Sequence, residues 1–323
     1  MKVYNSQSDK ALNGGLLKLL ETYRSERAFD AGGYIKQKAK KLNDYMGRSG
    51  LKICVVAVSG GIDSAVVLGL VHQASQIPGS PIESIIPLFL PVFDERAATN
   101  QSSARDKARE LCETFGLAMR EVDISPLHEF AKQLVDGAME MNGDDWASGQ
   151  LVAYLRTPTM YYVTSLCSQI GQPAIICGTT NYDEGGYLGY FGKASDGMVD
   201  VQIISDAHKS EVRKLARSLG VPQSIINAAP TGDMYDGRPD EELFGAPYDF
   251  VELYMHYLNH PPQKQSTMRT LLDDDDRQQF DVLGERLENL HAYNHHKYIA
   301  RSPAVHLDIL KASVQGGWNN ERI

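Results

Sequence analysis

Residues 53–66 read Ile-Cys-Val-Val-Ala-Val-Ser-Gly-Gly-Ile-Asp-Ser-Ala-Val, and this stretch decides the fold of the chain. The apolar run 53–58 is typical of a buried strand, and it stops abruptly at Ser59-Gly60-Gly61. A helix is predicted to follow, with Asp63 and Ser64 in its first turn. Because two adjacent glycines let the backbone take positive φ angles and approach a ligand closely, the turn is a candidate binding site.

The chemistry of this turn favours a phosphate or pyrophosphate. Its successive N–H groups point the same way, and the N-terminus of the helix adds partial positive charge. The hydroxyls of Ser59 and Ser64 add donors. The carboxylate of Asp63 would repel a phosphate in this turn, and its presence is explained if it holds Mg²⁺ on the phosphates. The turn is not a Walker A loop, because no Lys-Ser/Thr follows the glycines. A plain turn with an N-capping Asp is the alternative.

Beyond the turn, strand and helix patterns alternate. Strands are predicted at 53–58, 84–90, about 118–122 and 174–177, and helices at 64–76, 100–115 and about 150–170. This alternation predicts an α/β fold, a Rossmann-like three-layer sandwich with a mostly parallel sheet. Two amphipathic helical patterns precede it, so residues 1–48 are predicted to form an N-terminal helical extension and residues 49–323 the main domain.

Composition limits the classes of function. The 323 residues carry a formal net charge of −9, which disfavours a surface that coats nucleic acid. No leader-like or membrane-spanning apolar segment is present, so we expect a cytoplasmic protein without membrane contact. The four cysteines, at positions 54, 112, 167 and 177, are predicted to be buried free thiols.

The segment Ser59-Gly60-Gly61-Ile62-Asp63-Ser64 resembles the pyrophosphate loop of the N-type ATP pyrophosphatases, which share an adenine nucleotide α-hydrolase-like fold. These enzymes cleave ATP between the α and β phosphates and activate a substrate as its adenylate. Segment 178–200 then resembles the NAD synthetase family, with Gly-Thr after a strand and Glu184 five residues beyond the Thr. Further matches follow in order at 208–211, 230–234, 240–249 and 296–303. The resemblance covers about residues 51–310.

The resemblance implies an ammonia-dependent NAD synthetase with Mg²⁺ and ATP. It gives catalytic roles to Asp63, Lys209 and Thr231, and it makes Asp63 and Glu184 the metal ligands. The implied ATP-binding residues are Ser59, Gly60, Gly61, Asp63, Ser64, Thr179, Lys209 and Thr231. The implied dinucleotide-binding residues are Arg156, Lys193, Asp196, Asp200, His296 and Lys297. A homodimer built on long helices is also implied.

The expected reaction needs no protein nucleophile. A carboxylate becomes a good acyl donor once its oxygen is joined to the α-phosphorus of ATP, and pyrophosphate leaves. Ammonia then attacks the adenylate and releases the amide and AMP. Positioning and electrostatic stabilisation of the leaving pyrophosphate would carry catalysis. Because the chain leaves no room for an added glutaminase domain, we expect free ammonia or a separate donor protein.

Two departures from the family pattern leave the acceptor open. The segment 91–96 replaces the family's His-Gly or Tyr-Gly element, and residues 153–160 keep Arg156 but lose a second arginine. Pro158 also falls in this helix, and proline breaks a helix interior. The part of the dinucleotide site that this helix forms in the family is therefore expected to differ in this chain. Nicotinate adenine dinucleotide is the default acceptor; nicotinate mononucleotide or another acid is the alternative. A non-catalytic nucleotide sensor is the rival from a different class.

Several site residues also have an alternative, purely structural explanation. Glu184 could be an acid at a helix start, acting on the helix dipole. Asp196-Gly197 is by itself a common turn sequence. His296, next to another histidine, could be a solvated helix end.

Overall fold

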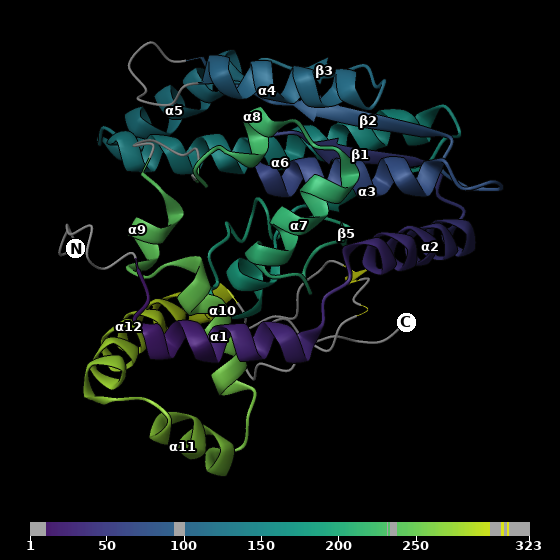
Figure 1. Cartoon of the computed structure of the whole chain (residues 1–323). Coiled ribbons are helices and arrows are strands. Elements are labelled where there is room, and N and C mark those ends of the chain that lie inside the picture. The colour runs from purple at the N-terminus through teal and green to yellow at the C-terminus, as the bar shows by residue number, and fades with distance from the viewer. Residues whose placement is uncertain are drawn as a thin grey trace.

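The computed structural model of the chain describes residues 11–93, 101–230, 232, 238–297, 305, 306 and 309. Within these residues six strands form one sheet, and helices cover both of its faces (Figure 1). The strands are β1 (Ile53–Ala57), β2 (Ser84–Phe89), β3 (Arg120–Glu121), β4 (Ala174–Gly178), β5 (Val201–Gln202) and β6 (Val305–His306). The helices around the sheet are α2 (Ala31–Ser49), α3 (Ile62–Ser75), α4 (Gln101–Thr114), α5 (Ser125–Met139), α6 (Asp145–Gln169), α7 (Lys209–Leu219) and α8 (Gln223–Ile226).

The strand order is β3-β2-β1-β4-β5-β6, and every neighbouring pair is parallel. The chain therefore winds outward from β1 to β3 and returns to the other side of β1 with β4. In a sheet wound in this way, ligands bind beyond the carboxyl ends of the strands where the order reverses. The predicted α/β sandwich with a mostly parallel sheet is confirmed.

The central strand β1 is buried on both faces, which explains its unbroken apolar sequence. Cys54 and Val56 belong to a core shared with helices α2, α3, α4 and α7. Ile53 and Val55 point the other way, into a core shared with α6. The two-residue period of a strand thus distributes one short run between two layers.

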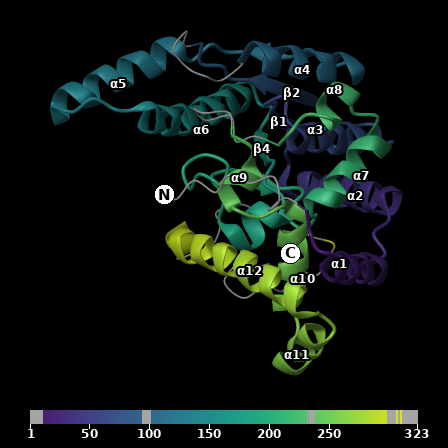
Figure 2. The same cartoon turned by 60° about the vertical axis from the view of Figure 1, so that its left-hand side comes forward.

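A second group of helices forms a lobe beside the sandwich. It comprises α1 (Gly14–Arg27), α9 (Asp240–Phe244), α10 (Tyr248–Leu258), α11 (Pro262–Thr270) and α12 (Asp274–Asn294). Figure 2 shows α1, α10 and α12 together below the sheet. Leu16 and Leu20 of α1 are buried in this lobe, whereas Leu42 and Met46 of α2 are buried in the core next to β1. The predicted division of the chain at residue 48 stays a prediction.

Several elements differ from the sequence prediction. Helix α5 was not expected, and α6 begins at Asp145, five residues before the predicted start. Pro158 lies inside α6 without ending it, because the helix runs on to Gln169. Residues 240–244 form α9, a short helix that was not predicted. Helix α12 is capped by Asp273, whose side chain accepts the N–H of Asp276.

Among the residues that the structure describes, no helix is both long and apolar enough to cross a membrane.

Candidate functional site

A cavity of about 470 Å³ lies where the strand order reverses. The bend after β1 and the residues after β4 form its walls, as expected for the carboxyl ends of neighbouring parallel strands. Of the predicted site residues, it is lined by Ser59, Gly60, Gly61, Asp63, Ser64, Thr179, Glu184, Asp196 and Lys209. Residues that are distant in sequence thus line one cavity.

The bend itself depends on Gly60. Its φ angle is +79°, in the left-handed region that favours glycine. A Cβ atom at this position would also lie 2.6 Å from the carbonyl oxygen of Ala104 in α4. Ser59 and Ser64 hold the bend from inside, since their hydroxyl oxygens are 3.2 Å apart. Both the backbone angle and the space therefore require glycine here.

The polar centre of the site is the side chain of Lys209, the first residue of α7. Its Nζ atom lies 2.5 Å from Oδ2 of Asp63 and 3.0 Å from Oε1 of Glu184. The ammonium is also 4.9 Å from the centre of the Tyr248 ring. Only 2% of the Lys209 side-chain surface is exposed. Both predicted metal ligands and the predicted phosphate-binding lysine therefore form one cluster.

The protonation of this cluster follows from burial and charge. Burial alone lowers the pKa of Lys209, but the carboxylates of Asp63 and Glu184 outweigh it and raise the pKa above its usual value. Burial raises the pKa of Glu184 to about 7, although Lys209 opposes the shift. The pKa of Asp240 is also raised by burial. Near neutral pH, Lys209 is thus a cation and Glu184 is poised to gain or lose a proton.

Three residues of the site were not predicted from the sequence. Asn181 donates from Nδ2 to Oδ1 of Asp63 at 2.9 Å. The Tyr248 hydroxyl lies 2.7 Å from Oε1 of Glu184 and 3.0 Å from Oδ2 of Asp240. Asn181 and Asp240 both occur in the matched segments, but nothing in a linear pattern says that their side chains turn inward. For Asn181, the available signal in the sequence was its position just after the end of β4.

Four of the predicted dinucleotide residues lie near one another. Lys297 donates from Nζ to the carbonyl oxygens of Gly189 and Phe191 at 2.7 and 2.6 Å. Burial lowers its pKa to about 8. Lys193 donates to the carbonyl oxygen of His296 at 3.4 Å. The fourth, Asp196, accepts from the N–H of Gly192 at 3.4 Å and borders the cavity. The short helix η3 (His295–Lys297) thus meets the segment 189–197 at the rim.

The remaining two dinucleotide residues lie deeper in the sandwich. Asp200 accepts the N–H of Ile176 in β4 at 2.7 Å, and the Tyr161 hydroxyl is 3.4 Å from it. Arg156 donates from Nε to the carbonyl oxygen of Leu90 at 3.2 Å. Neither side chain lines the cavity. Thr231 lies outside the described residues.

The donor set of the cluster fits a divalent cation. Three carboxyl groups, those of Asp63, Glu184 and Asp240, lie near the single ammonium of Lys209. Within the described ranges no group of three His, Cys, Asp or Glu side chains forms a complete metal cage. Mg²⁺ commonly binds through one or two carboxylates and takes its other ligands from phosphates and water, so a full cage is not required.

A cavity with this lining, at the point where the strand order reverses, defines the class of protein: a nucleotide-binding α/β protein. Comparison with known proteins narrows the class. The family described as NAD synthase matches residues 34–298, most of the chain, and the chain belongs to this family.

Relatives and solved structures agree with the assignment. The chain is 31% identical over 207 residues to the NH3-dependent NAD⁺ synthetase of Methanococcoides burtonii, covering 63% of this chain and 71% of the relative. It is 32% identical over 225 residues to that of Mesoplasma florum, covering 69% and 80%. The structure of NMN synthetase from Francisella tularensis matches with a TM-score of 0.64 at 24% identity, over 83% of this chain and 96% of that one. The last likeness shows the shared fold.

Proposed function

We propose that the chain is an ATP-dependent amide ligase. It adenylates the carboxylate of nicotinate adenine dinucleotide and amidates it with ammonia, giving NAD, AMP and pyrophosphate. The observation that carries the proposal is the cluster of Asp63, Glu184 and Lys209 beside the Gly60 bend, in a chain of the NAD synthase family.

The residues of the cavity suit the first half of this reaction. The backbone N–H groups around Gly60 and Gly61, at the start of α3, are donors for the phosphates of ATP. Lys209 brings a fixed cation to the charge that develops on the leaving pyrophosphate. Thr180 also borders the cavity, and its buried hydroxyl has no hydrogen-bond partner among the described residues, so it offers a further donor.

Mg²⁺ is part of the proposal. Asp63 and Glu184 would hold it, and it would neutralise charge on the phosphates. Asn181, which donates to Asp63, fixes the orientation of one proposed ligand. Tyr248 does the same for Glu184. Thr231, predicted to contact the phosphates, belongs to the proposal through its sequence match alone.

The acceptor is proposed to lie toward the rim formed by Asp196, Lys193, His296 and Lys297. One observation favours keeping nicotinate mononucleotide as a second candidate. Residues 153–160 keep one arginine of the family pattern, Arg156, and lack the second. Arg156 donates a hydrogen bond to the carbonyl oxygen of Leu90. The segment around Arg156 is therefore one place where the chain departs from the family pattern, and this departure is the reason for keeping the smaller acid as a candidate.

An acceptor assay tests the proposal. The purified protein is incubated with Mg²⁺, ATP, ammonium and one acid at a time, and AMP, pyrophosphate and amide product are measured. We expect amide formation with the dinucleotide acid and its loss in Asp63→Ala. Turnover with the mononucleotide acid alone would select the second candidate. ATP binding without AMP release for any acid would indicate a nucleotide sensor instead.

A homodimer is also proposed, through the outer face of α5 and α6, which lie side by side in Figures 1 and 2. This face carries large exposed apolar side chains at helical spacing. They include Leu127, Phe130, Leu134, Met139, Tyr154, Tyr162, Leu166 and Ile170. Because exposed apolar side chains on two neighbouring helices favour association, a second copy of the chain is the proposed partner.

A cytoplasmic location remains a prediction. The four cysteines are buried and free, as expected for a reducing compartment.

A further inference from the structure

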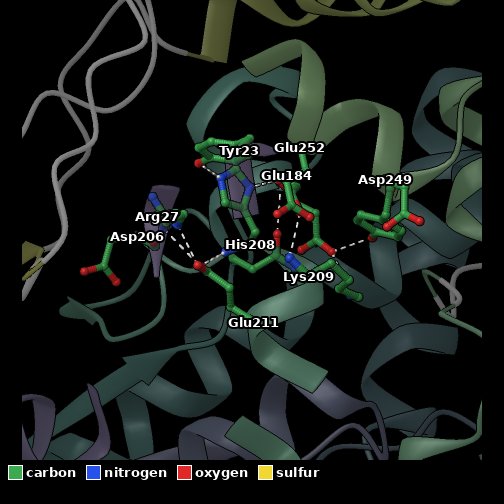
Figure 3. A network of polar contacts seen from close by, with 12 residues as sticks. Tyr23, Arg27, Glu184, Asp206, His208, Lys209, Glu211, Asp249 and Glu252 are labelled. Atoms are coloured by element: carbon green, nitrogen blue, oxygen red, sulfur yellow. Dashed lines mark hydrogen bonds and ion pairs between the residues drawn. The ribbon is translucent and has the colours of Figure 1, made fainter. Parts of the chain in front are cut away.

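Helix α1 lies outside the residues matched by the family, which begin at 34, yet its side chains reach the residues next to Lys209. Figure 3 shows Tyr23 and Arg27 of α1 directed at His208 and Glu211, on either side of Lys209 in sequence. Two separate chains of contacts make this connection.

The first chain of contacts runs through the His208 ring. The Tyr23 hydroxyl is 3.0 Å from Nε2 of His208, and Nδ1 of His208 is 2.5 Å from Oδ1 of Asp183. The other oxygen of Asp183 accepts the backbone N–H of Lys209 at 2.7 Å. Asp183 directly precedes Glu184, so the same carboxylate links the backbone positions of two members of the cluster.

The second chain of contacts runs through Glu211. Arg27 donates to both carboxylate oxygens of Glu211, at 2.5 and 3.0 Å, and to the carbonyl oxygen of Asp206 at 2.8 Å. Glu211 in turn accepts the backbone N–H of His208 at 2.9 Å and so caps the start of α7. Arg27 therefore holds the loop before Lys209 and the first turn after it.

Burial makes both chains of contacts rigid. His208 and Asp183 are completely buried, and Glu211 is 2% exposed. A buried polar group that loses its partner is costly, so these side chains have few alternative arrangements. Stacking of the His256 ring on Tyr23, with centroids 3.8 Å apart, fixes the tyrosine as well.

We propose that Tyr23 and Arg27 are positioning residues that hold the Lys209 ammonium in register with Asp63 and Glu184. Helix α1 is then a support for the active site, added to the part of the chain that the family shares. The predicted effect on kcat rests on the proposed function. The predicted effect on nucleotide binding rests on the contacts described above.

The test compares Tyr23→Phe and Arg27→Met with a matched control on the same helix. Arg24→Met is the control, because Arg24 binds Glu252 and Asp249 of α10 and does not touch the Lys209 loop. For each protein, kcat, the KM of each substrate, the Kd of Mg·ATP by calorimetry and the thermal midpoint are measured.

We expect Tyr23→Phe and Arg27→Met to lower kcat by about ten- to hundredfold, because small displacements of a catalytic group have effects of that size. The Kd of Mg·ATP should rise about tenfold, and the KM of the acid should change little. Arg27→Lys, which keeps a donor and the charge, should recover part of the loss. Arg24→Met should lower the thermal midpoint and leave kcat unchanged.

The proposal is overturned if all three substitutions lower the thermal midpoint alike while kcat and the Kd of Mg·ATP stay at wild-type values. If the wild-type protein forms no amide with any acid, the proposed function fails, and the calorimetric comparison still decides the inference. Should Arg27→Met not fold, Tyr23→Phe and Arg27→Lys carry the same comparison.

Discussion

At the residue scale, Lys209 is the side chain on which the site depends. It is nearly inaccessible to solvent and stays charged because Asp63 and Glu184 adjoin it. Lys209→Met keeps most of the length of the side chain but removes the charge. We expect kcat to fall roughly 100- to 1000-fold, the usual effect of losing one group that stabilises transition-state charge. The measurement is the initial rate of AMP formation with saturating substrates.

The matched control for this substitution is Lys214→Met, on the exposed side of the same helix. It removes an equal charge from α7 without touching the cavity and should leave the rate near that of the wild type. Equal rates for the two variants would remove Lys209 from the chemistry.

Glu184 provides a prediction about pH and stability. Burial raises the pKa of this carboxyl from 4.5 to about 7. A group with a raised pKa stabilises the fold in its protonated form, so its contribution is complete below pH 4.5 and is lost as the pH rises through 7. In urea titrations, the stability of the wild type relative to Glu184→Gln should therefore decline between about pH 5 and about pH 8.

Since His208, whose pKa is also raised, is present in both proteins, the difference between the two curves reports the removal of the Glu184 carboxyl. Glu184→Gln should at the same time lose turnover, because an amide is a weak ligand for Mg²⁺. Parallel stability curves would show that the Glu184 carboxyl does not titrate in this window.

The extent to which the site could be predicted from sequence differs between its parts. Ser59 to Ser64 formed a local motif, and a turn of that kind keeps its geometry wherever it occurs. Lys209 and Glu184 could be named only through resemblance, because their approach to Asp63 depends on the folding of distant segments. Asn181 and Tyr248 were missed since their roles arise from tertiary contacts alone.

At the scale of elements, α6 contains a proline that the helix tolerates. Pro158 has no N–H to offer the carbonyl oxygen of Tyr154, and its ring is exposed. We expect Pro158→Ala to raise the free energy of unfolding by roughly 1–3 kcal/mol, since an interior proline costs about 3 kcal/mol relative to alanine. Chemical denaturation measures the change.

Thr159→Ala is the control for this prediction, because it alters the next residue without restoring a backbone donor. If Pro158→Ala is no more stable than this control, the helix has already adapted to the proline by relaxed packing.

The strands and most of the sandwich helices could be predicted because short apolar runs alternate with longer helical segments and turn residues along the chain. Helix α5 was missed, although Leu127, Phe130 and Leu134 are spaced as on one face of a helix; Gly137 weakens the pattern near its end. Helices α10 to α12 carry few local sequence motifs, so their packing could not be predicted.

At the scale of the whole molecule, the apolar face of α5 and α6 predicts association. Sedimentation should give a species of twice the 35.7 kDa chain mass. Leu134→Glu together with Tyr162→Glu should shift it to the single-chain mass, because burying two carboxylates in an apolar interface is costly. Leu271→Glu, on an exposed leucine after α11, is the control and should leave the dimer intact.

The buried carboxylate of Asp206 carries a consequence for how the sequence can change over evolution. It accepts hydrogen bonds from Tyr34 and Lys38 of α2 and from the N–H of Ile309, so early and late parts of the chain share one anchor. Removing only the cation would strand a negative charge in the interior. We therefore expect position 38 and position 206 to covary among homologues, with lysine lost only where the acid is lost too.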